Sequence, residues 1–292
     1  MAGEPPPALP PLLDCHCHAW RIWPYAPLVP DERTRGTVEQ LLYEMDAHGV
    51  EQAVVVCARI ENNPDNIEYA AFARERHPDR LHVLADIDCT WSATYHSGGS
   101  AGRLRALAGR HDLAGFTHYT HAGNDGWLGS EDADELFGVA SEHRMIVSLG
   151  ASPAWHADLR ALALRHPDVP ILCHTLGGIR AGEELDPAGL NEVLESAGVP
   201  NIYLKVAGMH YCSPRGWDYP WRDVLAVLER LVAAYGAERL CWGSDFPAGT
   251  RFCTYRQSLE AIRTHAGFLD ARELGLVLGG NLRRLLNGRP AG

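Results

Sequence analysis

The chain has 292 residues, of which 46% are hydrophobic and 22% charged, and its formal net charge at pH 7 is −11. This composition is typical of a folded globular protein, and the acidic balance argues against binding to nucleic acid or to an anionic membrane. No run approaches the roughly 18 consecutive apolar residues of a membrane span. The proline-rich segment 1–11 lacks the basic start of a signal peptide, so we expect a flexible N-terminal tail followed by one domain over 12–292.

Several common motifs are missing from the sequence. The eight cysteines include no C-x-x-C pair, which argues against zinc ribbons and thioredoxin-like redox sites. Without a secretion signal, we interpret the cysteines as reduced thiols of a cytoplasmic protein. The only lysine, Lys205, follows a leucine, so there is no P-loop, and no G-x-G-x-x-G marks a dinucleotide site.

Short apolar runs recur along the chain and predict strands. Their starts lie roughly 30 residues apart, which is the size of one strand–helix unit. The eight runs are 12–18, 53–58, 82–87, 113–118, 145–150, 170–174, 201–207 and 239–245.

Helical patterns lie between and after these runs. In chain order they are the pattern 38–45 that stops at Gly49, the Ser152-Pro153 start, the segment from Asp186-Pro187 to Gly198, the apolar stripe 224–232 and a last helix around 270–287. Eight strand–helix pairs predict an α/β protein built as a single (β/α)₈ TIM barrel. An open doubly wound sheet is the alternative, and the missing nucleotide motif argues against it.

In a barrel, the working side chains come from the carboxyl ends of the strands. The first predicted strand ends in the five residues from Asp14 to His18. Because strand side chains alternate, we predict His16 and His18 on one side together with Asp14, and Cys15 and Cys17 on the side of the helices. Two imidazoles about 6–7 Å apart by strand rise can converge on one metal ion or one substrate oxygen.

Two further strands end in residues that suit catalysis. His174 ends the sixth run, ahead of a glycine-rich turn, and Asp245 ends the eighth, ahead of a Phe-Pro turn. An aspartate at this position suits general-base catalysis or metal ligation. Because the strand ends of a barrel meet at one face, we predict that these residues join His16 and His18 in a single site.

This pattern of H-x-H on the first strand, a histidine after the sixth and an aspartate after the eighth resembles the amidohydrolase superfamily. The segments DCHCHAW, ILCHTLGG, NIYLKVAG, RLCWGSDFP and GNLRRLL are similar to the branch that contains 2-pyrone-4,6-dicarboxylate lactonase and sugar-acid lactonases. The likeness covers the chain from about residue 12 to 287.

The departures from the superfamily pattern bear on the metal. The lysine that bridges two metals in binuclear members has no counterpart, and Ser148 stands where many mononuclear members have a strand-five histidine. The resemblance therefore implies at most one divalent metal, zinc or manganese, or catalysis without a metal. The implied ligands are His16, His18 and Asp245, with His174 as a fourth. The run 115–119 also lacks the arginine with which pyrone lactonases hold a substrate carboxylate.

We predict a hydrolase that opens a lactone or related cyclic ester or amide of a small aromatic or cyclic organic substrate. Asp245 acts as the general base that activates water, and His16, His18 and His174 polarise the carbonyl oxygen directly or through a metal. The candidate substrate-binding residues in the loops are Trp20, Arg21, Arg59, Trp91, His118, Tyr119, His210 and Arg215. The same loops carry Trp23, Tyr25, His121, Tyr211 and Trp217.

Two other functions compete with hydrolysis. Metal-dependent non-oxidative decarboxylation, or hydration, of a cyclic acid fits the same superfamily, but such members usually keep the strand-five histidine that Ser148 replaces. A catalytically inactive barrel that binds a partner is the other, and the intact histidines and Asp245 argue against it. The expected partner is a small-molecule substrate, and a homo-oligomer is compatible with the sequence.

Two local motifs suggest other chemistries. Residues 98–102 match G-x-S-x-G, but a nucleophile elbow needs a strand before it, and loop residues precede this one. A Schiff-base role for Lys205 would leave the histidine pair unexplained. A structural role, or a contact with a substrate carboxylate, fits this lysine better.

Overall fold

Eight parallel strands form one sheet in the computed structural model, which describes residues 11–288. Each strand pairs with the next one along the chain, from β1 to β8. The strands are β1 Leu12–Cys17, β2 Val50–Val56, β3 Leu81–Asp86, β4 Gly115–Tyr119, β5 Ile146–Gly150, β6 Ile171–Cys173, β7 Ile202–Val206 and β8 Leu240–Trp242. All eight predicted runs are strands, and the predicted (β/α)₈ barrel is confirmed.

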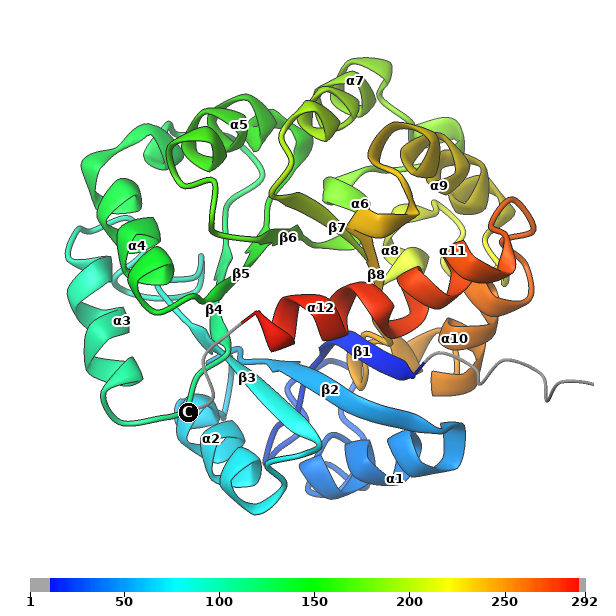
Figure 1. The fold of residues 1–292 in the computed structure, drawn as a ribbon. Coiled ribbons are helices and arrows are strands. Elements are labelled where there is room, and N and C mark those ends of the chain that lie inside the picture. Colours follow the sequence, from blue (N-terminus) through cyan, green and yellow to red (C-terminus); the bar gives the residue numbers. More distant parts are fainter. Residues whose placement is uncertain (1–10, 289–292) are drawn as a thin grey trace, which may run out of the picture.

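Helices surround the sheet (Figure 1). The longer ones are α1 Val38–His48, α2 Asn66–Arg76, α3 Ser100–Ala108, α4 Glu131–Glu142, α5 His156–Arg165, α7 Pro187–Glu195, α9 Arg222–Tyr235 and α10 Tyr255–Arg263. The shorter ones are α6 Thr175–Gly178, α8 Met209–Cys212, α11 Ala271–Gly275, a π-helical segment Leu276–Gly280 and α12 Asn281–Asn287. Single 3₁₀ turns lie at Trp127–Gly129, Pro153–Trp155, Gly182–Glu184, Ser196–Gly198, Ala237–Arg239 and Ala248–Arg251.

The residues that the sequence marks as helix ends can be compared with the caps that they form in the structure. Gly49 ends α1 in a left-handed conformation with φ of 71°, which glycine adopts without strain. The Asp186 carboxylate accepts hydrogen bonds from the backbone amides of Ala188 and Gly189 at the start of α7. Ser152-Pro153 instead opens a 3₁₀ turn, and α5 begins after it at His156.

Two apolar layers hold the barrel together. The interior is filled by a small cluster that includes Leu13, Val54, Leu172 and Cys241, while a larger cluster packs the outward strand faces against the helices. Leu282 of α12 joins the interior cluster, so this last helix covers the end of the barrel where the strands begin (Figure 1). The opposite end, where the strands finish, is left for the site.

The barrel is closed by β1 and the chain that follows β8. The Asp245 amide donates to the His16 carbonyl oxygen at 2.8 Å, and the His18 amide donates to the Phe246 carbonyl oxygen at 2.5 Å. The structure ends β6 at Cys173 and β8 at Trp242, earlier than the sequence runs do. His174 and Asp245 therefore stand in the first residues beyond their strands.

Other sequence expectations meet the structure as follows. The expected tail over 1–11 lies outside the described residues except for Pro11. All eight cysteines are buried free thiols. Within residues 11–288, no helix is both long enough and apolar enough to cross a membrane.

The pairing of β4 with β5 depends on Gly115. A Cβ at this position would lie 1.8 Å from the Ile146 carbonyl oxygen, which is backbone and held in the sheet. We expect Gly115→Ala to lower the free energy of unfolding by about 2–3 kcal/mol, because overpacking displaces strand backbone. Denaturant unfolding followed by circular dichroism measures this. The matched control is Gly138→Ala in α4, where a Cβ meets nothing within 4 Å; it should stabilise the protein by up to about 1 kcal/mol. Equal stability of the two variants would contradict the prediction.

Candidate functional site

A bulge in β1 sets the orientation of the first-strand residues. Asp14 pairs with Ala53 and Cys17 with Val55, so β1 uses three steps where β2 uses two. Cys15 consequently packs inside the barrel, and the Asp14 side chain points outward to α10. The prediction that Asp14 shares the side of the histidines and that Cys15 faces the helices is therefore wrong, because the extra residue breaks strict alternation. Cys17 does pack in the outer layer.

The Asp14 carboxylate stabilises the closure of the barrel from the outer side of β1, which faces α10. One oxygen accepts the backbone amides of His16 at 3.0 Å and Ser244 at 2.9 Å, and the other accepts the Tyr255 hydroxyl at 2.9 Å. Burial raises the pKa of Asp14 above its usual range, against the lowering effect of these hydrogen bonds. A single buried carboxylate thus ties the backbone before Asp245 to the backbone of His16.

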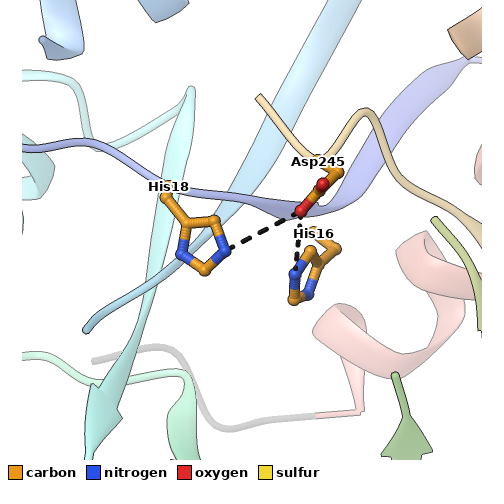
Figure 2. Close-up of side chains that lie close together, drawn as sticks. All are labelled: His16, His18 and Asp245. Atoms are coloured by element: carbon orange, nitrogen blue, oxygen red, sulfur yellow. Dashed lines mark ion pairs between the residues drawn. The ribbon is translucent and has the colours of Figure 1, made fainter. Parts of the chain in front are cut away.

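His16, His18 and Asp245 converge at the seam, which is where β1 meets the chain after β8 and closes the barrel (Figure 2). The Asp245 Oδ1 atom lies 3.6 Å from His16 Nε2 and 3.9 Å from His18 Nε2. One ligand atom from each of the three residues lies within 4.8 Å of the other two, and all three residues are buried. Asp245 has φ of 57°, a left-handed conformation that a non-glycine residue adopts only when its surroundings enforce it. The closure hydrogen bonds supply that enforcement.

Burial sets the ionisation of this cluster. It raises the pKa of Asp245 to about 8 and lowers the pKa of His18 to about 4. The pKa of His16 is also lowered well below its usual value, by burial first and then by the nearby Lys205 charge. Both imidazoles are therefore neutral, which is the state in which histidine binds a metal or donates a hydrogen bond without carrying charge.

The donor set fits one divalent metal. His18 Nδ1 lies 2.6 Å from the Val56 carbonyl oxygen and donates to it, so the Nε2 lone pair faces Asp245. A histidine whose second nitrogen donates to a backbone carbonyl is the usual arrangement of a metal ligand. Asp245 Oδ2 has no hydrogen-bond partner within the part of the chain that the structure describes. Two nitrogens and a carboxylate are a set that zinc accepts.

His16 Nδ1 can either accept a hydrogen bond from Lys205 or donate one to it. The direction decides whether His16 Nε2 is free to bind a metal. Its Nδ1 lies 3.0 Å from Lys205 Nζ, and burial lowers the pKa of Lys205 to about 8. When the lysine donates, neutral His16 carries its proton on Nε2 and offers a donor to the cavity. When the neutral amine accepts, the proton sits on Nδ1 and Nε2 is free to bind a metal.

A buried network continues from Lys205 to the sixth strand. Lys205 Nζ donates to Ser148 Oγ at 2.6 Å, and Ser148 Oγ lies 2.5 Å from His174 Nε2. His174 packs edge-on against His16, with ring centroids 4.6 Å apart. The network therefore joins His174 to the cluster on β1, and the four predicted catalytic residues lie together as expected.

A cavity of about 510 Å³ opens above these residues. Its lining includes the four predicted catalytic residues and the rings of Tyr25, Tyr119, His121 and Tyr211. Arg251 lies against this wall: its guanidinium donates to the Tyr211 hydroxyl at 2.7 Å and stacks 4.3 Å from the Tyr25 ring. The cavity is of a size that takes a small organic molecule.

Two predicted substrate-binding residues lie at the cavity or at the cluster beneath it. Tyr119 lines the cavity. His210 Nε2 lies 3.6 Å from Asp245 Oδ2, and its ring stacks on Phe252. Burial lowers the pKa of His210 to about 3, so this imidazole is neutral.

The other predicted contacts lie away from the cavity, and each has an identifiable partner. Trp20 stacks on His18 and donates to the Ala58 carbonyl, so it supports His18 from behind. Arg59 and Trp91 both bind the buried carboxylate of Asp86.

Three more predicted contacts lie elsewhere. His118 points outward, donates to the Ile87 carbonyl oxygen and stacks on Trp127. Arg21 is exposed and pairs with Asp65. Arg215 is also exposed and lines a different cavity.

Sequence reasoning gave no site role to Asp14, Ser148 and Arg251, which the structure places around the cluster. For Lys205 it allowed a structural role or a contact with a substrate carboxylate. The sequence does contain a signal for Lys205, because it is the only lysine and occupies an inward position of an apolar strand. For Asp14 the sequence pattern is misleading, since strand alternation predicts this side chain inside the barrel.

Comparison with known proteins gives the family. The family model described as amidohydrolase matches residues 13–288. The chain belongs to the amidohydrolase family. The predicted superfamily is therefore confirmed, and with it an enzyme of a family that acts on small molecules. No curated protein matches the sequence of this amidohydrolase.

Solved structures share the fold at low identity. An amidohydrolase from Burkholderia multivorans with bound zinc is 17% identical and has a TM-score of 0.77, with 96% of this chain and 100% of that chain covered. A probable 2-pyrone-4,6-dicarboxylic acid hydrolase from Acinetobacter baumannii is 20% identical with a TM-score of 0.73, covering 94% and 99%. The 2,6-dihydroxybenzoate decarboxylase from Rhizobium is 13% identical with a TM-score of 0.63, covering 95% and 99%.

The seam behind the site can be tested through Tyr255. In Tyr255→Phe, the buried Asp14 carboxylate loses a hydrogen bond, and we expect the free energy of unfolding to fall by about 1.5–3 kcal/mol. Activity should fall as well, because Asp14 aligns the backbone of His16 and Ser244. The control is Tyr235→Phe, which removes a hydroxyl bound to the Val193 carbonyl oxygen far from the site; about 1 kcal/mol should be lost with full activity. An active Tyr255→Phe enzyme of unchanged stability would contradict this assignment.

Proposed function

We propose that this amidohydrolase is a hydrolase that opens an uncharged lactone or related cyclic ester. The observation that carries the proposal is the pairing of one buried carboxylate of raised pKa, Asp245, with neutral histidines at the mouth of a barrel. A carboxylate whose pKa is about 8 is poised to take and return a proton near neutral pH. The histidines around it, His16, His18 and His174, can stabilise negative charge on a carbonyl oxygen.

The reaction uses these side chains in sequence. Asp245 accepts a proton from water, and the resulting hydroxide attacks the carbonyl carbon of the ring ester. His16, His18 and His174 polarise the carbonyl oxygen and stabilise the tetrahedral oxyanion. As the ring carbon–oxygen bond breaks, protonated Asp245 returns its proton to the leaving alkoxide. The product is a single open-chain hydroxy acid, because both groups of the ring ester stay in one molecule.

One divalent metal would be held by His16, His18 and Asp245. When bound, it supplies Lewis-acid polarisation of the carbonyl and a more acidic water. Bound zinc in the similar Burkholderia multivorans structure supports this assignment.

The chemistry of the cavity supports an uncharged substrate. Among the described residues that line it, none is an arginine or a lysine, whereas tyrosine, threonine and serine hydroxyls are frequent. Lys205 is fully buried beneath the cavity, and Arg251 is engaged with Tyr211 and Tyr25. The positive group against this wall is Arg251, which already binds Tyr211 and Tyr25, whereas a hydroxylated ring would find several hydroxyl partners in the lining itself.

A second candidate function is metal-dependent decarboxylation of a hydroxylated aromatic acid. The structural similarity to 2,6-dihydroxybenzoate decarboxylase favours it. Ser148 argues against it, because this serine binds Lys205 and His174 at the strand-five position where such enzymes usually have a histidine. Hydration of a cyclic acid belongs to the same alternative.

A substrate panel tests the function. We expect the protein to hydrolyse uncharged five- and six-membered sugar lactones with a kcat/KM roughly 10-fold or more above that for 2-pyrone-4,6-dicarboxylate, since a buried charge without a partner is disfavoured. Ring opening is followed by acid release in a pH-indicator assay. Carbon dioxide release from 2,6-dihydroxybenzoate, without lactone hydrolysis, would contradict the proposal and support the decarboxylase.

In Asp245→Asn, kcat should fall roughly 10²–10⁴-fold, because the general base is lost. The control Arg21→Ala changes an exposed residue outside the cavity and should keep full activity.

Zinc titration tests the metal set independently. We expect metal-free wild-type protein to bind about one zinc per chain, with binding lost in His18→Ala, because two ligands rarely hold zinc. Isothermal calorimetry and elemental mass spectrometry measure this. The control His121→Ala changes another cavity histidine that is not in the cluster and should bind zinc normally. Equal zinc binding by wild type and His18→Ala would exclude this site. Full lactone hydrolysis by metal-free protein would mean that the side chains alone perform the reaction.

A further inference from the structure

A line of three buried polar side chains runs beneath the cavity. Lys205 and Ser148 are fully buried, and His174 is 5% exposed. The line starts at Lys205 Nζ, passes through Ser148 Oγ at 2.6 Å and ends at His174 Nε2, 2.5 Å further on. Neither Lys205 nor Ser148 lines the cavity, so their effect on the reaction must pass through the histidines.

Hydrogen bonding along this line favours one tautomer of His174. The Lys205 amine donates to Ser148 Oγ. The serine hydroxyl can still donate its single hydrogen, and His174 Nε2 lies within reach of it. When Nε2 accepts this hydrogen bond, a neutral His174 carries its own proton on Nδ1.

The second nitrogen of His174 lies beside Gly150 at the edge of the cavity. A Cβ at Gly150 would lie 3.0 Å from His174 Nδ1 and 2.6 Å from the Tyr119 ring, so only glycine leaves this space open. Both Gly150 and His174 line the cavity. Within residues 11–288, no hydrogen-bond partner of Nδ1 is found. The proton on Nδ1 is therefore available to a molecule in the cavity.

We propose that Ser148, anchored by Lys205, holds His174 in the tautomer whose Nδ1–H donates to the substrate carbonyl oxygen. Ser148 and Lys205 are then positioning residues, and His174 is the catalytic donor. A neutral imidazole can polarise a carbonyl in this way without the cost of burying a charge. This inference rests on the proposed hydrolysis of a ring ester. It also gives a reason for serine at the strand-five position, because a hydroxyl can both accept from the lysine and donate to the histidine.

Nitrogen NMR of the histidine rings reads the tautomer without any substrate. In ¹⁵N-labelled wild type, with His174 assigned by comparison with His174→Gln, we expect a protonated Nδ1 and an acceptor Nε2. In Ser148→Ala, Nε2 loses its donor, and the ring should shift toward the Nε2–H tautomer. Ser148→Thr keeps a hydroxyl and should keep the wild-type pattern.

Kinetics of the same variants test the consequence. We expect kcat on an uncharged lactone to fall at least roughly 10-fold in Ser148→Ala with little change in KM, since a lost oxyanion donor costs up to 10²–10³-fold. Ser148→Thr should recover most of that loss. Lys205→Met should lower kcat in the same direction, because the serine hydroxyl is then free to turn away.

The outcomes separate this inference from the proposed function. An Nε2–H tautomer in wild type would overturn the inference whatever the activity. Unchanged tautomer and kcat in Ser148→Ala would overturn it too. The expected tautomers in a protein that opens no lactone would support the positioning by Ser148 and overturn the proposed substrate class.

Discussion

Closure of the barrel between β1 and the chain after β8 is the constraint on which the site depends. The amide of Asp245 donates to His16, and the amide of His18 donates to Phe246, so the backbone bonds that close the sheet also bring the cluster together. The Asp14 carboxylate binds both sides of this seam from the outer layer. Fold stability and site geometry therefore rest on the same few hydrogen bonds.

Exclusion of water is the second physical cause of the site's properties. Burial keeps the histidines neutral and raises the pKa of Asp245 to about 8, so one environment produces both the polarising groups and the base. Lys205 is equally buried, yet its amine is used within the protein, by His16 and Ser148. The only lysine of the chain thus binds His16 and Ser148 and does not line the cavity.

Loop position alone did not separate the residues that line the cavity from those that lie elsewhere. His118 and Tyr119 are neighbours on one strand, and alternation allows only one of them to face the cavity, which is Tyr119. Asp86, which no motif marked, binds Arg59 and Trp91. In β1 the alternation rule itself failed, because a bulge leaves no signature in the residue types around Asp14 and Cys15.

The sequence by itself predicted the eight strand–helix units and the convergence of four side chains at one end of the barrel, those of His16, His18, His174 and Asp245. It could do so because strand ends converge at one face of any closed barrel, whatever the details of packing. The tertiary structure alone decided the outward turn of Asp14, the line from Lys205 through Ser148 to His174 and the hydroxyl-rich cavity wall. These features join residues as far apart as Asp14 and Tyr255, which are 241 positions apart in the sequence. Such contacts depend on strand register and side-chain direction, and no local pattern in the sequence encodes either.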